Sequence, residues 1–269
     1  MRRRALLLGA AALGCSGARQ PSSGLAHGLL ALAQSHVPTP AHELNWAWAE
    51  LRHLIDRVAE RRSRGSAGAQ AVTQVLFDDM GFVREVDDTA LRFVVLPDVL
   101  KGRRGSCVGL GTVYLCIAEA LGFTAHGVLR PGHFYVRQQA PGAPCNVELL
   151  RRGELMPDAW YSQRFPFSRP ASGSYDRPLS NAEVVGVTAF NIGNERRRRH
   201  ELEPAARAYG AAISAFPTFA EAHASLGAMQ QALGRPELAE QSYARALRLD
   251  PGLPGVDNNL ALLGSSAPR

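Results

Sequence analysis

The stretch that decides the fold is Arg104–Gly122, RGSCVGLGTVYLCIAEALG. Gly105 and Ser106 supply a turn and a helix N-cap, and apolar residues then recur at helical spacing up to Gly122, which is suited to end the helix. Cys107 therefore falls in the first turn of the predicted helix, where free N–H groups and the helix dipole favour thiolate over thiol. The helix alone leaves two interpretations of Cys107, a reactive nucleophile or a small core residue.

Three predicted strands follow this helix. They cover residues 123–129, His133–Arg137 and Asn146–Leu149, with a Pro-Gly turn between the first two. His133 begins the second strand. The third strand carries Asn146 and Glu148, whose side chains point to the same face because they are two residues apart. A cysteine at a helix start, a histidine and an acid or amide are the groups that an activated thiol nucleophile needs.

These residues carry a resemblance to a known family. The motifs are LPDVL at 96–100, RRGSC at 103–107, LGF at 121–123, PGH at 131–133 and NVE at 146–148. Over roughly residues 75–165 the chain resembles the bacterial branch of the transglutaminase-like superfamily, which implies an α+β fold with a papain-like core. The resemblance implies that Cys107 is the nucleophile and His133 the general base.

The third catalytic position departs from the family's pattern. The resemblance implies an Asp there, and this strand offers Glu148 or Asn146 instead. We favour Glu148, since it occupies the acid position, and Asn146 is the alternative. The chain has four cysteines. Their spacings match no zinc motif, and a disulfide between Cys116 and Cys145 stays open. The sequence predicts no metal and no cofactor.

From residue 181 the chain changes to helices with an internal period. Six pairs of small, aromatic or proline residues lie 34 positions apart: Ile192/Leu226, Gly193/Gly227, Ala205/Ala239, Tyr209/Tyr243, Ala212/Ala246 and Pro217/Pro251. Thirty-four residues is the tetratricopeptide period, and the pattern resembles that repeat. The sequence predicts about two and a half units over residues 181–263, which would bind a protein or peptide in their groove. The run Arg196–Arg199 is a partner-binding patch or a solvated helix end.

The first twenty residues have the composition of a leader. Arg2–Arg4 form a basic region, and an apolar stretch follows that is too short to cross a bilayer. The sequence ALGC ending at Cys15 resembles a bacterial lipobox, which implies lipidation of Cys15; plain secretion is the alternative. We therefore expect an exported protein, either periplasmic or held at the membrane only through a lipid on Cys15.

The expected domain organisation follows from these segments: a signal peptide at 1–20, a tether at 21–41, a transglutaminase-like domain at 42–165, a linker at 166–180 and the repeats at 181–263. Within the second domain, helical patterns cover residues 45–62 and 69–80. After the third strand, residues 153–165 predict a short helix whose aromatic residues close over the sheet.

Composition restricts the function classes further. The chain has 269 residues, a net charge of +6 and an isoelectric point near 9.5. The basic residues are not interleaved with aromatic ones along a stripe, so we expect no nucleic-acid binding. The sequence then leaves two functions. One is cysteine-dependent acyl transfer, meaning amide or peptide hydrolysis or crosslinking. The other is a non-catalytic interaction or scaffold protein that keeps an inactive transglutaminase-like fold.

Overall fold

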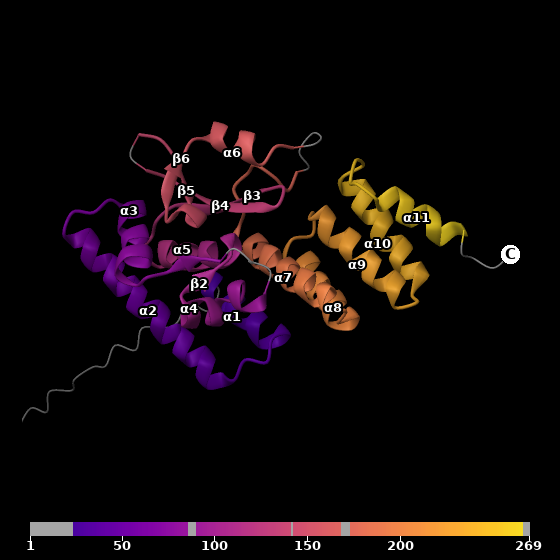
Figure 1. Ribbon diagram of the computed structural model, residues 1–269, viewed down its shortest axis with the longest axis horizontal. Helices are drawn as coiled ribbons and strands as arrows, with labels where there is room; N and C mark the ends of the chain where they lie inside the picture. The colour runs from indigo at the N-terminus through magenta and orange to yellow at the C-terminus, as the bar shows by residue number, and fades with distance from the viewer. Residues whose placement is uncertain (1–23, 86–89, 141, 168–172, 266–269) are drawn as a thin grey trace, which may run out of the picture.

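The computed structural model describes residues 24–85, 90–140, 142–167 and 173–265. The expected leader, with Cys15, lies outside the described residues. Figure 1 shows a small sheet with helices packed on it, followed by a row of C-terminal helices. Helices and a small antiparallel sheet together make the fold α+β, as the sequence predicts.

The first helix corrects one expectation. Residues 21–41 were expected to be a tether, but α1 spans Leu25–His36 and its leucines are buried. The Leu25 N–H donates to Glu119 Oε2 at 2.8 Å, and the helix packs against α4, α5 and α7. Its leucines at helical spacing find an apolar surface on these partners, so the segment folds as part of the core.

The next elements lead to the nucleophile segment. The helix α2 spans Ala41–Ser63, and α3, Gly68–Thr73, continues into a π-helical turn, η1, Gln74–Asp79. These correspond to the two expected helices. Then follow β1 (Val83–Arg84), η2 (Leu91–Phe93), α4 (Leu96–Gly102) and β2 (Arg104–Gly105), with β1 and β2 paired in parallel. The pairing fixes the chain immediately before Cys107.

The central helix α5, Cys107–Ala120, packs against a four-stranded antiparallel sheet in the order β3-β4-β5-β6. The strands are β3 (Ala125–Arg130), β4 (His133–Gln138), β5 (Cys145–Glu148) and β6 (Glu154–Met156). A 3-10 turn, η3 (Leu149–Arg151), joins the last two. The three expected strands are present. The strand β6 was missed, because its three residues alternate too briefly to separate them from the helix α6, Asp158–Arg164, that follows.

The expected linker is also corrected where the structure describes it. Backbone N–H groups of Asp176 and Leu179 donate to Leu129 and Gly127 in β3, at 3.0 and 2.9 Å. Leu179 is buried and Ser174 Oγ donates to Thr218 O. The residues from 173 to 180 therefore lie along the edge of the sheet, where β3 leaves backbone groups available for pairing.

The C-terminal part is helical: α7 (Asn181–Arg198), α8 (Leu202–Ala215), α9 (Ala220–Ala232), α10 (Pro236–Leu249) and α11 (Val256–Ser265). Neighbouring helices pack in sequence order, and α7 also packs on α1 and α5. One apolar core runs from α1 through α5 to α7 and α8. The C-terminal helices therefore share a core with the sheet-containing part.

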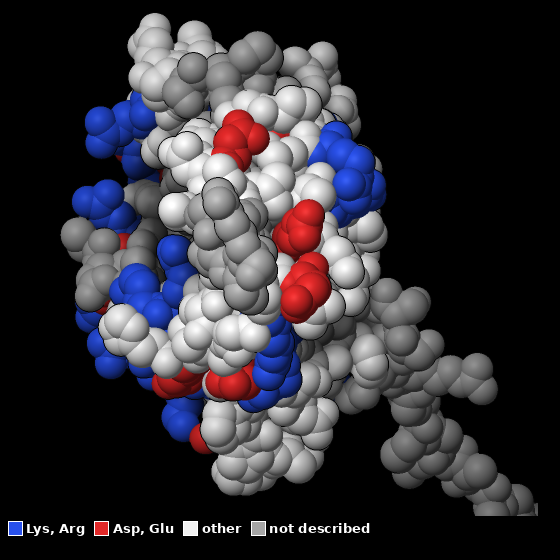
Figure 2. Space-filling model, turned by 90° about the vertical axis from the view of Figure 1, so that its right-hand side faces the viewer, with Lys and Arg blue, Asp and Glu red and all other residues white. Residues whose placement is uncertain are grey.

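Surface charge on the end of the molecule formed by the C-terminal helices is mixed. Figure 2 shows acidic and basic side chains interspersed among uncharged ones, some of them in direct contact, with the basic ones more frequent toward the left edge. Among the described residues, no helix combines the length and apolar character that a membrane span requires.

Candidate active site

Cys107 is the first residue of α5, as predicted. Ser106 caps the helix: its Oγ accepts from the Gly109 N–H at 3.1 Å, and its own N–H donates to Phe93 O. A side chain at Gly109 would lie 2.1 Å from that same carbonyl oxygen, so only glycine allows this close approach. The residue Cys107 is 9% exposed. The capped helix start therefore fixes the backbone of Cys107 in the first turn, where N–H groups lack intrahelical partners.

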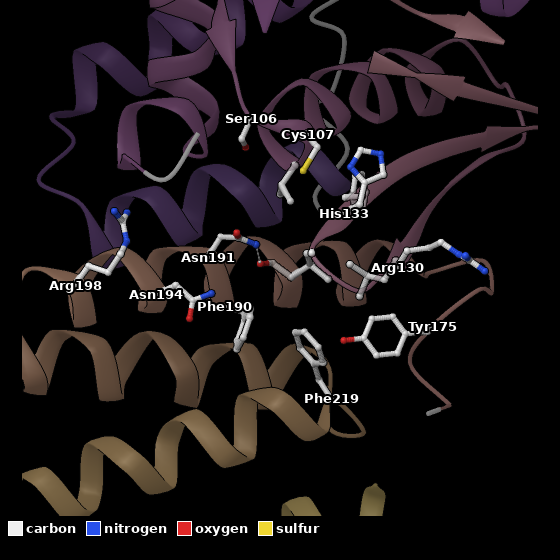
Figure 3. A pocket seen from close by; sticks show the side chains of 15 residues that line it. Ser106, Cys107, Arg130, His133, Tyr175, Phe190, Asn191, Asn194, Arg198 and Phe219 are labelled. Atoms are coloured by element: carbon white, nitrogen blue, oxygen red, sulfur yellow. Dashed lines mark hydrogen bonds between the residues drawn. The ribbon is translucent and has the colours of Figure 1, made fainter. Parts of the chain in front are cut away.

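His133 begins β4 and lies opposite Arg130 across the turn. Gly132, with φ +68°, allows that tight turn. His133 and Cys107 line the same cavity, of about 230 Å³, and Figure 3 shows the thiol and the imidazole next to one another. The structure thus brings together two side chains that are 26 residues apart in the sequence.

Glu148 contacts the Nε2 nitrogen of the His133 imidazole. His133 Nε2 lies 2.7 Å from Glu148 Oε2, and both side chains are buried. The second carboxylate oxygen, Oε1, accepts from the Leu150 N–H at 3.0 Å. Because Nε2 is engaged by Glu148, Nδ1 is the nitrogen left for the thiol proton.

Asn146 lies elsewhere on the same face of the sheet. It is opposite Arg137 in the register, and its Oδ1 accepts from Arg137 Nε at 2.8 Å. Its Nδ2 donates to Asp158 Oδ1 and Met156 O. Asn146 and Glu148 thus share a face of the sheet, as expected for residues two positions apart, but their side chains contact different residues of β4. Of the two alternatives, only Glu148 contacts His133.

Aromatic rings cover the imidazole. Phe165 stacks on His133 with ring centroids 4.0 Å apart and planes 5° from parallel, while Tyr135 and Tyr161 stack on each other nearby. Burial raises the pKa of Tyr135 to about 12. Burial, and then the Glu148 charge, raise the pKa of Tyr161, whose hydroxyl makes no hydrogen bond of good geometry. The imidazole is therefore buried against aromatic rings, and the aromatic residues of the segment 153–165 pack on the sheet, as expected.

Arg130 holds the aromatic residues around His133 in place. The buried guanidinium donates to Tyr161 O and Phe165 O, both at 3.0 Å, and forms a bidentate ion pair with Asp176. Arg130 thereby ties the end of α6, which carries Phe165, to the segment that leads into α7. Sequence reasoning missed this role, because the partners lie 31 to 46 residues further along the chain.

The other side of the cavity comes from the C-terminal helices. Five residues of α7 line it together with Tyr175 and Phe219: Val187, Phe190, Asn191, Asn194 and Arg198. Sequence reasoning missed this helix face. Its spacing of three and four residues was visible, but only the tertiary structure shows what the face is turned toward.

The remaining cysteines take no part in the site. Cys107, Cys116 and Cys145 are free thiols in the structure, so the disulfide between the last two is not formed. Burial raises the pKa of the Cys116 and Cys145 thiols, which keeps both protonated at neutral pH. The described residues contain no cluster of three or more potential metal ligands.

A thiol, an imidazole and a carboxylate held by a helix and a small antiparallel sheet define a class of site. The family comparison gives the same class: residues 45–185 match the family model described as the transglutaminase-like superfamily. The match covers more than half of the chain, so the chain belongs to this superfamily, and the resemblance noted from the motifs is confirmed. No curated protein matches the chain.

Proposed function

We propose that the protein is a cysteine-dependent acyl-transfer enzyme, with Cys107 as nucleophile, His133 as general base and Glu148 as the residue that orients the imidazole. The observation that carries the proposal is the buried 2.7 Å contact of His133 Nε2 with Glu148, made by a ring that lines the same cavity as the Cys107 thiol. Superfamily membership supports the same class of chemistry.

The reaction would proceed in two balanced steps. His133 Nδ1 takes the Cys107 proton, and the thiolate attacks an amide carbonyl, whose oxygen faces the N–H groups at the start of α5. The C–N bond breaks, the amine leaves with the proton from His133, and a thioester remains. Water then gives a carboxylic acid, or a second amine gives a new amide, and the thiol is restored.

The test is the reactivity of the thiol. Quantitative mass spectrometry after iodoacetamide treatment of the intact protein measures the alkylation rates of Cys107, Cys116 and Cys145 separately. We expect Cys107 to react faster than free cysteine at neutral pH, since an activated thiol is partly ionised there. We expect His133→Gln to remove the advantage. A Cys107 rate no higher than that of free cysteine would contradict the proposal.

The alternative is a non-catalytic interaction protein that keeps the fold. Two observations favour it: the glutamate at the position implied to be Asp, and the burial of residue Cys107, which is 9% exposed. A slow thiol together with full biological function of Cys107→Ala would support this alternative.

We also propose that residues 181–263 are about two and a half tetratricopeptide units that bind a protein or peptide. Equivalent contacts in the two units support this: a side chain at Gly193 or Gly227 would collide with the ring of Tyr209 or Tyr243. The turns are equivalent too, since His200 has φ +58° where Gly234, 34 residues later, has φ +70°.

For the location, the proposal is export, with lipidation of Cys15 as membrane anchor, on the basis of residues 1–15 alone. Mass spectrometry of the mature protein from membrane fractions tests it. An unmodified N-terminus at Met1 in the cytoplasmic fraction would contradict export.

A further inference from the structure

The cavity that holds Cys107 has a second side that the proposed chemistry does not use. Its lining residues on α7 lie at positions 187, 190, 191, 194 and 198, which is one face of a helix. A substrate large enough to fill the cavity must therefore contact α7 as well as the catalytic groups, and the side chains on this face select what can bind.

Two asparagines on this face present opposite hydrogen-bonding groups. Asn191 Nδ2 donates to Val187 O at 2.9 Å, so its Oδ1 is left to accept. Asn194 Oδ1 accepts from the Tyr209 hydroxyl at 2.8 Å, so its Nδ2 is left to donate. An acceptor followed one turn later by a donor is complementary to the N–H and C=O groups of an extended peptide backbone. Figure 3 shows both side chains beside the cavity.

One further turn along, the face becomes cationic. Arg198 lines the cavity and pairs with Glu195, which is buried and also accepts from Arg199. Arg196 pairs with Glu201. Four arginines, at 196–199, outnumber the two glutamates Glu195 and Glu201 at this helix end, so the end of the helix is basic. A carboxylate is the ligand that a guanidinium at such a place favours.

The spacing sets the length of the ligand. Seven residues separate Asn191 from Arg198, which is about 10 Å along a helix. An extended chain covers that distance in about three residues. Beside the asparagines, the partly buried Phe190 and the buried Phe219, with ring centroids 4.8 Å apart, give the cavity an apolar floor.

We propose that α7 is a peptide-binding wall of the active site and that it selects an acidic peptide. The backbone of an extended segment pairs with Asn191 and Asn194, and an acidic side chain about three residues further along that segment binds Arg198. The inference rests on the proposed function, since it names the substrate class of that same site.

Binding without turnover tests the inference. The full chain carrying Cys107→Ser is titrated against fluorescein-labelled eight-residue peptides with a central glutamine, and fluorescence anisotropy gives the affinity. A glutamate is placed three residues before or three residues after that glutamine, and each peptide has a matched peptide with glutamine there. We expect the glutamate peptide of one placement to bind roughly five- to tenfold more tightly than its match, the size of a partly exposed charge-assisted hydrogen bond.

The variants separate this site from general charge attraction. Arg198→Gln should abolish the preference for glutamate. Arg199→Gln should retain it, since Arg199 has the same partner, Glu195, and a similar exposure, 49% against 46%, but does not line the cavity. Asn194→Asp keeps an acceptor for Tyr209 but loses the donor, so it should weaken binding of the glutamine peptides as well.

Each outcome bears on one idea. Equal binding of glutamate and glutamine peptides, no binding of either, or equal losses in Arg198→Gln and Arg199→Gln would overturn the inference. A reactive Cys107 in the iodoacetamide assay, with no preference for glutamate peptides, would overturn the inference and leave the proposed function intact. A slowly reacting Cys107 together with a peptide preference that depends on Arg198 would contradict the proposed function and support the binding preference inferred here.

Discussion

The Glu148 carboxylate decides which tautomer His133 adopts. A carboxylate only accepts hydrogen bonds, so the imidazole nitrogen that faces it, Nε2, must carry a hydrogen. The neutral ring then has its lone pair on Nδ1, which is what a base for the thiol proton requires. Burial of both partners strengthens the contact, because water does not compete for the carboxylate.

We therefore expect Glu148→Gln to slow alkylation of Cys107 at neutral pH by about tenfold or more, because the amide no longer stabilises an imidazolium next to the thiolate. Mass-spectrometric alkylation rates measure the effect. Asn146→Ala is the matched control, since Asn146 is on the same strand and face but contacts Arg137 and Asp158. Equal losses in the two variants would show that the strand, and not the carboxylate, controls the thiol.

At the scale of elements, Phe134 joins α5 to the sheet beside the site. A side chain at Gly111 in α5 would lie 2.4 Å from this ring, and so would one at Gly127 in β3. The two glycines leave just enough room for the ring between helix and sheet. The sequence GLGTVYL, residues 109–115, therefore does more than form a helix, because its Gly111 also sets how closely the helix packs on β4.

Gly111→Ala should lower the free energy of unfolding by about 1–3 kcal/mol, the cost of overpacking a filled core. Urea denaturation measures it. Gly210→Ala in α8 is the control, since nothing lies within 4 Å of an added side chain there. That variant should stabilise the protein by about 0.5–1 kcal/mol through helix propensity. Destabilisation by Gly210→Ala would show that an alanine in place of a helical glycine is unfavourable without any collision. The loss in Gly111→Ala could then not be assigned to the contact with Phe134.

The elements around the site could be predicted because their determinants are local. Ser106, Gly122 and the turn before His133 sit within a few residues of what they cap or connect. The helix α1, the pairing of residues 173–180 with β3, and the face of α7 could not be predicted. The helix α1 and the pairing with β3 depend on partners more than 45 residues away, and the α7 face borders a cavity with Cys107 and His133, more than 50 residues earlier. No local pattern encodes such partners.

At the scale of the whole molecule, burial is divided unequally. One cluster of apolar side chains includes α1, α5, α7 and α8 and extends to Phe219 and Ala222 at the start of α9. A separate, smaller cluster joins α9, α10 and α11. Cooperative unfolding follows contiguous cores, so the two ends of the C-terminal part differ in local stability.

Hydrogen exchange followed by mass spectrometry should therefore show the amides of α7 exchanging at rates close to those of α5, and those of α10 and α11 exchanging much faster. The smaller core costs less to open, whereas α7 opens only with the main core. Uniform protection across α7 to α11 would contradict this, as would early exchange of α7. The same experiment on Gly111→Ala should speed α5 and α7 together.

Among the C-terminal helices, only α7 and the residue that precedes α9 border the cavity. Gain or loss of helices at the distal end would then alter the reach of the protein toward other molecules while leaving the cavity with Cys107 as it is. The distal helices and the residues around the cavity can therefore change independently of one another during evolution. The helix α7 belongs both to the C-terminal helices and to the cavity wall, so its changes affect both.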